Sequence, residues 1–373
     1  MDGAITAAHS GGMDEMSMIT SVGGGIGSLA PEQFAPETVY LNTAATGLVP
    51  APAVAAMHDA ATAYSRGRPG GEDHFQVVDA VRDAFARLVG VPARRVATGG
   101  SAAVFCGLIA QSLPDGAEVL CAEGDFSSLV NPFHVRPGLH VRTVPLEKIA
   151  AEVRPGTALV AVSSVQSADG RVADLRAIEE AARAHGARTL VDISQSAGWL
   201  PTDAGAHDFT VCVGYKWLMG PRGTAFLTVP EDLGGLSPVF AGWVAGEDPW
   251  GSTYGPVTAL ASSARRYDHN PALLAYVGSL AGLRLVEELG PERIAAHDRA
   301  LADRFRAGLA RLGHRPVPAD GSAIVSVPGL GPGPTERLSA AGVRASTRAG
   351  RLRVAFHVYN SAADVDAALA ALS

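Results

Sequence analysis

Long apolar runs, basic clusters and a secretory signal are all missing from the 373-residue chain. No apolar stretch reaches the ~20 residues that a transmembrane helix needs, and the N-terminus lacks the basic and apolar regions of a signal peptide. The formal net charge is -7, and no run of Lys or Arg offers a surface for nucleic acid or an anionic membrane. These absences favour a cytoplasmic protein that acts on a small molecule.

Cysteine is scarce as well, with only Cys106, Cys121 and Cys212 in the chain. No two of them form a CxxC pair, and all three lie in apolar stretches. We therefore expect reduced thiols in the core rather than disulfides. The 11 histidines show no metal-ligand spacing, so we expect no metal site.

Residues 1–30 are rich in Gly, Ser, Met and Ala and show little periodicity, which predicts a flexible leader. The GGGIG stretch at residues 23–27 follows no convincing strand and lacks a full GxGxxG. It is more typical of an ordinary glycine-rich segment than of a dinucleotide fingerprint, which argues against a nucleotide-dependent dehydrogenase.

Helical and strand-like segments alternate from about residue 50. Near-continuous apolar strands separated by amphipathic helices predict an α/β fold with a mostly parallel sheet covered on both faces. The Gly-, Pro- and Trp-rich stretch at residues 234–256 reads as a long irregular loop, and helices and short strands follow it. We expect a large domain over residues 31–240 and a smaller α/β domain over residues 241–373. The expected helices cover residues 51–64, 75–89, 101–113, 174–187, 272–289, 296–313 and 362–372, and the expected strands lie within residues 94–100, 117–125, 158–165, 188–194, 209–215, 323–329 and 352–356.

Lysine is rare in this sequence, and Lys216 stands in the apolar stretch VGYKWLMGPRG after an expected strand. Burial there would lower its pKa and make it a nucleophilic amine that can attack an aldehyde. The competing interpretation is a surface lysine that extends its ammonium to water.

Asp192 ends a very apolar strand, so a cationic or hydrogen-bonding partner is expected for its carboxylate. A protonated pyridine nitrogen would serve, and Gln195 could reach a hydroxyl on the same ring. A helix N-cap role for Asp192 or Ser194 competes with this interpretation.

Two further strand ends complete the pattern. Gly99, Gly100 and Ser101 lie between a strand and a helix, where free N–H groups suit a phosphate, although Gly-Gly-Ser is also an ordinary turn. Phe126 follows a strand and could stack on a flat ring, although in isolation a core position is the more common one for such a residue. A phosphate, a flat ring, a protonated ring nitrogen and an aldehyde together describe pyridoxal 5′-phosphate (PLP).

The segments YLNTAATGLVP (residues 40–50), VDISQSAGWLPTD (191–203), GYKWLMGPRG (214–223) and RLRVAFHVYNSAADVD (351–366) resemble the fold-type I PLP-dependent enzymes of aminotransferase class V. That family includes cysteine desulfurases, kynureninases and isopenicillin N epimerase-like proteins. The resemblance covers nearly all of the chain after residue 30. It implies the fold-type I architecture and a homodimer.

The resemblance also assigns roles to individual residues. Lys216 would form the Schiff base, Asp192 would pair with the pyridine nitrogen, and Arg353 would grip the substrate carboxylate through a bidentate fork. The other implied cofactor contacts are Gly100, Ser101, Ala102 and Tyr215 at the phosphate, Asn270 in a segment that crosses to the partner's phosphate, Phe126 and Gln195 at the ring, and Gln166 beside it.

This chain departs from the cysteine desulfurase pattern in two places. The segment STRAGRLRV before the carboxylate arginine holds no cysteine, which disfavours a persulfide mechanism. Val213 stands where many relatives have a phosphate-binding Ser or Thr. The aromatic loop could shape a substrate pocket through Trp243, Trp250 or Tyr254.

The loss of that cysteine favours β-elimination, such as C–S cleavage of a cysteine-derived substrate, because elimination needs no thiol nucleophile. Transamination and epimerisation start from the same loss of the Cα proton and remain alternatives. A PLP-binding regulatory module is the non-enzymatic alternative, and the absence of a helix-turn-helix segment or basic patch counts against it.

Overall fold

The strands of the central sheet follow the order β2-β8-β7-β6-β5-β3-β4 in a computed structural model that describes residues 25–68 and 73–373. All neighbouring pairs are parallel except those of β8, which runs antiparallel to β2 and to β7. The predicted α/β class with a mostly parallel sheet is therefore confirmed. The strands are β2 (Val96–Gly99), β3 (Glu118–Ala122), β4 (His140–Val144), β5 (Thr157–Ser163), β6 (Arg188–Asp192), β7 (Phe209–Val213) and β8 (Ala225–Thr228).

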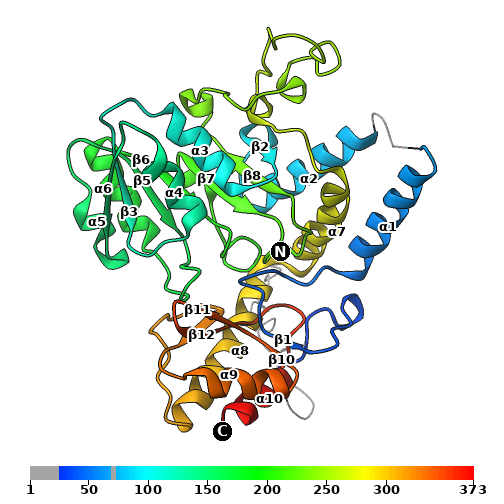
Figure 1. Ribbon diagram of the computed structural model, residues 1–373, viewed down its shortest axis with the longest axis vertical. Helices are drawn as coiled ribbons and strands as arrows, with labels where there is room; N and C mark the ends of the chain where they lie inside the picture. Colours follow the sequence, from blue (N-terminus) through cyan, green and yellow to red (C-terminus); the bar gives the residue numbers. More distant parts are fainter. Residues whose placement is uncertain (1–24, 69–72) are drawn as a thin grey trace, which may run out of the picture.

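Helices cover both faces of this sheet because successive strand residues point to opposite sides. Leu120 and Val160 face one side, with the helices α2 (Asp73–Leu88), α6 (Leu175–His185) and α7 (Leu273–Leu289). Val119 and Leu159 face the other, with α3 (Ala102–Ser112) and α4 (Ser127–Val135). Helix α1 (Ala51–Ser65) packs outside α7 (Figure 1).

A smaller unit lies beyond one end of this sheet (Figure 1). Its antiparallel strands are β9 (Ile324–Val327), β11 (Ser346–Arg348) and β12 (Arg351–Ala355), and its helices are α8 (Pro291–Arg311), α9 (Pro332–Ala340) and α10 (Ala362–Leu372). Strand β1 (Val39–Tyr40) pairs with β10 (Val343–Arg344). The smaller unit thus contains an early segment of the chain, and the domain boundary at residue 240 stays a prediction.

The predicted leader falls in two parts. Residues 1–24 lie outside the described residues. Residues 25–30 run along the smaller unit, where Leu29 N donates to Val358 O at 2.8 Å and Ala362 N donates to Ile26 O at 2.7 Å. Ala30 is buried against Trp199 and Trp217 in the apolar layer between the two units.

No helix in the described ranges is long and apolar enough to cross a membrane.

A buried ion pair ties helix α2 to the segment that leads into α7. Both oxygens of Asp268 accept from the Arg82 guanidinium, at 3.2 and 2.7 Å, and Oδ1 also accepts from Thr98 N at 2.8 Å. Burial opposes the charge on Arg82, but the adjacent Asp268 carboxylate outweighs it and raises the pKa of the guanidinium.

We expect Asp268→Asn to lower the free energy of unfolding by roughly 3 kcal/mol, because it leaves a buried guanidinium without its anion. Asp366→Asn is the matched control, since it breaks an Arg304–Asp366 pair that is about half exposed and should cost about 1 kcal/mol or less. Urea unfolding curves would measure both values. Equal losses of unfolding free energy in the two variants would contradict the expectation that the buried ion pair contributes more than the exposed one.

Candidate active site

The carboxyl ends of five strands meet at the edge of the sheet that faces the smaller unit. Strands β3, β5, β6 and β7 are parallel, and β2 shares their direction because it pairs antiparallel with β8. Ligands of open α/β sheets bind at such an edge. The structure therefore brings together the strand ends that carry Ser101, Phe126, Gln166, Asp192 and Lys216.

Lys216 lies at the centre of this edge and is 5% exposed. Its Nζ lies 5.0 Å from the centroid of the Phe126 ring, and it makes no hydrogen bond or ion pair with the residues that the structure describes. Burial lowers the pKa of Lys216, the Asp192 carboxylate opposes that effect, and the nearby Arg353 adds to it. The side chain is thus a buried amine, as predicted, and does not extend to water.

A close backbone approach holds the lysine segment in place. Gly47 N donates to Tyr215 O at 2.9 Å, and a Cβ at position 47 would lie 2.0 Å from the Lys216 carbonyl oxygen. Only glycine therefore fits this position without a shift of the backbone. Met219, whose N donates to Lys216 O at 3.1 Å, adopts a φ of 55° in the turn that follows.

Asp192 ends β6 and is 5% exposed. Its Oδ1 accepts from Ser194 N at 2.8 Å, so the local hydrogen bond of the competing N-cap interpretation is present. Burial raises the pKa of this carboxyl, and Lys216 opposes the shift. No described α-helix begins at Ser194, so the carboxylate can also serve a ligand at the sheet edge.

Asp125 organises the neighbouring strand ends and was missed in the sequence. It accepts from Phe126 N at 2.6 Å, from Ser163 Oγ and N at 2.5 and 2.8 Å, and from Gln166 Nε2 at 3.0 Å. These bonds fix the directions of Phe126 and Gln166. Phe126 is 40% exposed, and its ring lies next to Lys216, which leaves room for a flat ligand.

Gln195 is already engaged with protein groups. Its Nε2 donates to Ala44 O at 2.8 Å and to Ser167 Oγ at 2.9 Å, and its Oε1 accepts from Trp217 Nε1 at 2.8 Å. The side chain joins the loop before α1 to the lysine segment. Its contact with a ring oxygen stays a prediction.

The turn that leads into α3 presents Gly100, Ser101 and the first helical residue, Ala102, at the same edge. Ser101 is the N-cap, but its side chain makes no capping hydrogen bond, which leaves the hydroxyl and the first N–H groups for an anion. Tyr215 lies in the loop after β7, and the Arg222 guanidinium carbon is 4.3 Å from its ring centroid. Arg222, which also donates to Thr46 Oγ1 at 2.8 Å, is a cation that no motif in the sequence indicated.

Asn270 is exposed. The preceding residue, His269, donates its N–H to Thr98 O at 3.1 Å, so this segment lies beside the glycine turn of its own chain. A contact between Asn270 and a partner's phosphate stays a prediction.

Arg353 reaches the site from β12 of the smaller unit and is 2% exposed. Its Nη1 donates to Ser167 O at 2.5 Å and to Ser167 Oγ at 3.0 Å. Its Nη2 is buried without a partner among the described residues, and burial together with Arg348 lowers the pKa of Arg353 to about 10. A buried donor of this kind suits an incoming carboxylate.

The thiols belong to the core, as predicted. All three cysteines are free and buried. Burial raises the pKa of Cys121 to about 12 and the pKa values of Cys106 and Cys212 well above the ordinary range. In the described ranges, no group of His, Cys, Asp or Glu is arranged to hold a metal ion.

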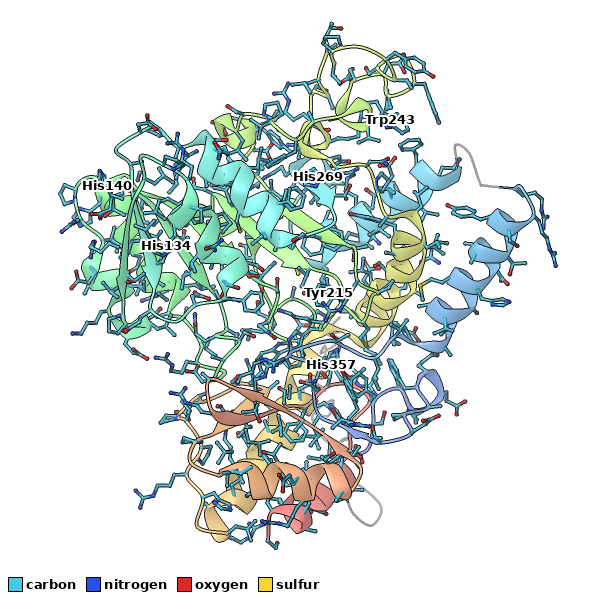
Figure 2. The ribbon with its side chains drawn as sticks, viewed as in Figure 1. His134, His140, Tyr215, Trp243, His269 and His357 are labelled. Carbon is cyan, nitrogen blue, oxygen red and sulfur yellow. The ribbon has the colours of Figure 1, made fainter. Side chains whose placement is uncertain are left out.

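The aromatic loop lies away from this edge within one chain. Figure 2 places Trp243 and Tyr215 well apart, with His269 between their levels. Trp243 and Trp250 pack on Phe75 at centroid distances of 5.5 Å, while Trp250 is 55% and Tyr254 92% exposed. In a single chain this loop therefore does not line the space around Lys216.

Curated proteins similar to this chain include a kynureninase of Deinococcus radiodurans, with 30% identity over 62% of this chain and 61% of the relative. An isopenicillin N epimerase of Streptomyces clavuligerus has 31% identity over 61% of this chain and 63% of the relative. The matches thus span somewhat less than two thirds of these relatives.

Solved structures share the fold. A cystine C–S lyase in complex with cysteine persulfide aligns with a TM-score of 0.79 at 24% identity, over 90% of this chain and 97% of the other. A cysteine desulfurase of Thermococcus onnurineus aligns with a TM-score of 0.77 at 23% identity, over 90% and 93%. The predicted architecture is confirmed.

The family model described as aminotransferase class-V matches residues 39–328, a range that contains the lysine segment, the Asp192 strand and the glycine turn. The family predicted from the sequence is thereby confirmed, and with it the expected cofactor, PLP. The chain belongs to the aminotransferase class-V family.

Proposed function

We propose that this protein is a PLP-dependent enzyme that removes the Cα proton of an amino acid. The observation that carries the proposal is the buried Lys216 amine, which makes no hydrogen bond or ion pair with the described residues. It lies 5.0 Å from the centroid of the Phe126 ring and is close enough to Asp192 for that carboxylate to affect its pKa. A lysine with only a structural role would extend its ammonium group to water or form an ion pair with a carboxylate.

The residues present fit this cofactor. The free first turn of α3 suits its phosphate, and Phe126 offers a face for its ring. The Asp192 carboxylate suits a protonated ring nitrogen, because burial disfavours its charge unless a cation is near. Lys216 is the amine in reach of the aldehyde.

PLP supplies an aldehyde and a protonated ring that withdraws electrons from Cα. The Arg353 fork orients the substrate carboxylate, and Ser167 holds that guanidinium in place. Asp192 keeps the proton on the ring nitrogen. The Lys216 amine, whose pKa burial lowers, accepts the proton from Cα as a general base.

Among the reactions open to such a site, we favour β-elimination of a cysteine-derived substrate. Each cysteine of the chain is buried with a raised pKa, so no thiolate is available to take a sulfur atom from the substrate. The similarity in fold to a cystine C–S lyase supports this choice by analogy.

The homodimer and the cytoplasmic location stay predictions. The exposed apolar side chains of Phe240, Trp250 and Tyr254 are of the kind that a second copy would cover, and sedimentation of the purified protein would give its mass.

Lys216→Ala should abolish covalent PLP attachment and lower turnover by at least about 10²-fold, because it removes both the attachment point and the base. Borohydride reduction followed by peptide mass spectrometry would locate the modified residue. Lys148→Ala is the control, since Lys148 is the other lysine of the chain and is exposed. Modification of position 148 in place of 216 would refute the assignment.

Arg353→Lys should raise KM for the amino acid roughly 10- to 100-fold, because the point charge is kept but the planar fork is lost, and a charge-assisted hydrogen bond contributes about 1.5–3 kcal/mol. Arg348→Lys, at an exposed position of strand β11, should change KM less than about threefold. Steady-state kinetics would test both. If both variants change KM by the same factor, Arg353 is not the residue that binds the substrate carboxylate.

Incubation with cystine or a cysteine S-conjugate should release pyruvate, ammonia and a sulfur product when no 2-oxo acid is added as an amino acceptor. Iodoacetamide should leave the rate unchanged, because buried thiols with raised pKa values react slowly. Product analysis by mass spectrometry would decide. A strict requirement for a 2-oxo acid acceptor would identify an aminotransferase instead.

A further inference from the structure

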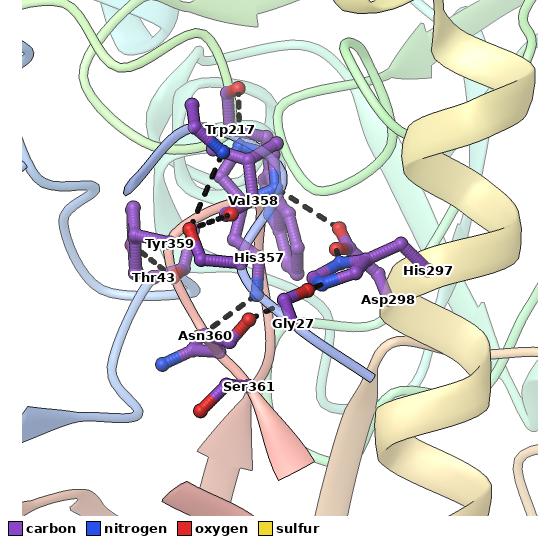
Figure 3. A network of polar contacts seen from close by, with 12 residues as sticks. Gly27, Thr43, Trp217, His297, Asp298, His357, Val358, Tyr359, Asn360 and Ser361 are labelled. Carbon is purple, nitrogen blue, oxygen red and sulfur yellow. Dashed lines mark hydrogen bonds and ion pairs between the residues drawn. The ribbon is translucent and has the colours of Figure 1, made fainter. Parts of the chain in front are cut away.

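A buried polar cluster contacts the lysine segment at the backbone of Trp217 (Figure 3). Asp298, on α8, is 0% exposed and contacts two imidazoles. Its Oδ2 lies 2.9 Å from Nδ1 of His357, and its Oδ1 lies 2.8 Å from Nδ1 of His297. The network thus has two similar arms that share one carboxylate.

The arms end on different backbone carbonyls. His357 Nε2 lies 3.0 Å from the carbonyl oxygen of Trp217, the residue after Lys216. His297 Nε2 lies 3.0 Å from Gly27 O and 3.2 Å from Asn360 O. A carbonyl oxygen can only accept, so each Nε2 must carry a hydrogen, while each Nδ1 faces an oxygen of the Asp298 carboxyl group.

The His357 arm connects the two elements that carry the proposed ligand groups. His357 follows β12, four positions after Arg353, and belongs to the smaller unit. Trp217 belongs to the larger unit, and its ring lies edge-on to the His357 imidazole at 5.1 Å. One side chain therefore fixes the distance between the Arg353 strand and the Lys216 backbone.

The alternative is a staple that only holds the two units together. The apolar layer at this junction, which includes Trp199, Trp217, Ile324 and Val358, already supplies burial. Replacing buried polar groups with apolar ones is often neutral or stabilising, so stability alone does not explain the cluster. The direction of its hydrogen bonds does explain the cluster, because a hydrogen bond fixes the position of a carbonyl group more sharply than an apolar contact does.

We infer that His357, oriented by Asp298, is a positioning residue that holds the Lys216 segment so that its amine stays buried and aligned with Arg353. The functional meaning of this alignment rests on the proposed function. The placement of Lys216 itself does not, and it can be measured without cofactor.

The test compares His357→Asn, His357→Gln and His297→Gln. Asn places its amide nitrogen near the position of imidazole Nδ1 and can bond Asp298, but it cannot reach Trp217 O. Gln places its amide nitrogen near Nε2 and can still donate to Trp217 O. His297→Gln perturbs the same carboxylate from the arm that does not touch the lysine segment.

The first readout is the pH midpoint for acetylation of Lys216 by acetic anhydride in the full-length chain freed of cofactor. Peptide mass spectrometry quantifies it, with exposed Lys148 as the internal reference. Burial lowers the pKa of Lys216, so a displaced and wetter amine should show a midpoint about one unit higher. We expect that rise in His357→Asn and an unchanged midpoint in His357→Gln and His297→Gln.

The second readout is steady-state kinetics with PLP restored. His357→Asn should lower kcat about 10- to 100-fold, as loss of a group that orients another commonly does, and His357→Gln should recover most of it. The positioning role is overturned if His357→Asn leaves the midpoint unchanged, or if His297→Gln raises it equally, since the cluster would then be a general staple. A wild-type chain that takes up no PLP would refute the proposed function and leave the acetylation result to decide the positioning role.

Discussion

The burial of one amine sets the conditions for the rest of this site. Lys216 is buried, and burial disfavours its charged form and lowers its pKa. The Asp192 carboxylate on the adjacent strand is the strongest influence in the opposite direction. That carboxylate is itself held by Ser194 N–H. Close backbone contacts help to keep both groups buried. Gly47 lies against the Lys216 carbonyl, Met219 N donates to that carbonyl, and His357 contacts Trp217 O in the same segment.

The elements that carry this pair follow from local sequence. Apolar strands such as β6 and β7 separated by an amphipathic helix such as α6 specify a parallel sheet, and strand ends then specify where a ligand binds. Lys216 and Asp192 were predictable because a charged residue after an apolar strand is costly without a partner. Strand β8, which reverses the sheet direction, and helix α4, which contains Pro132, were not predicted, because a short strand after a turn and a proline within a helix give weak local signals.

The supporting contacts lie beyond local reasoning for a different reason. Asp125 directly precedes Phe126, so its position was visible, but its bonds to Ser163 and Gln166 join strands about 40 residues apart. The His357–Asp298 contact joins residues 59 positions apart, and Arg222 bonds Thr46 across 176. Which residues become hydrogen-bond partners over such separations depends on how the whole chain packs, so neither their distance nor their orientation can be predicted from a single sequence.

The pairing of β1 with β10 has a consequence for the order of assembly. Leu41, next to β1, is 0% exposed in the core of the smaller unit, about 300 residues before the strand that its neighbours pair with. During synthesis the central sheet can form before the segments that pack around Leu41, which follow residue 290, have been made. A fragment cut after residue 290 would therefore lack part of its own interior, because Leu41 packs with side chains that follow that residue.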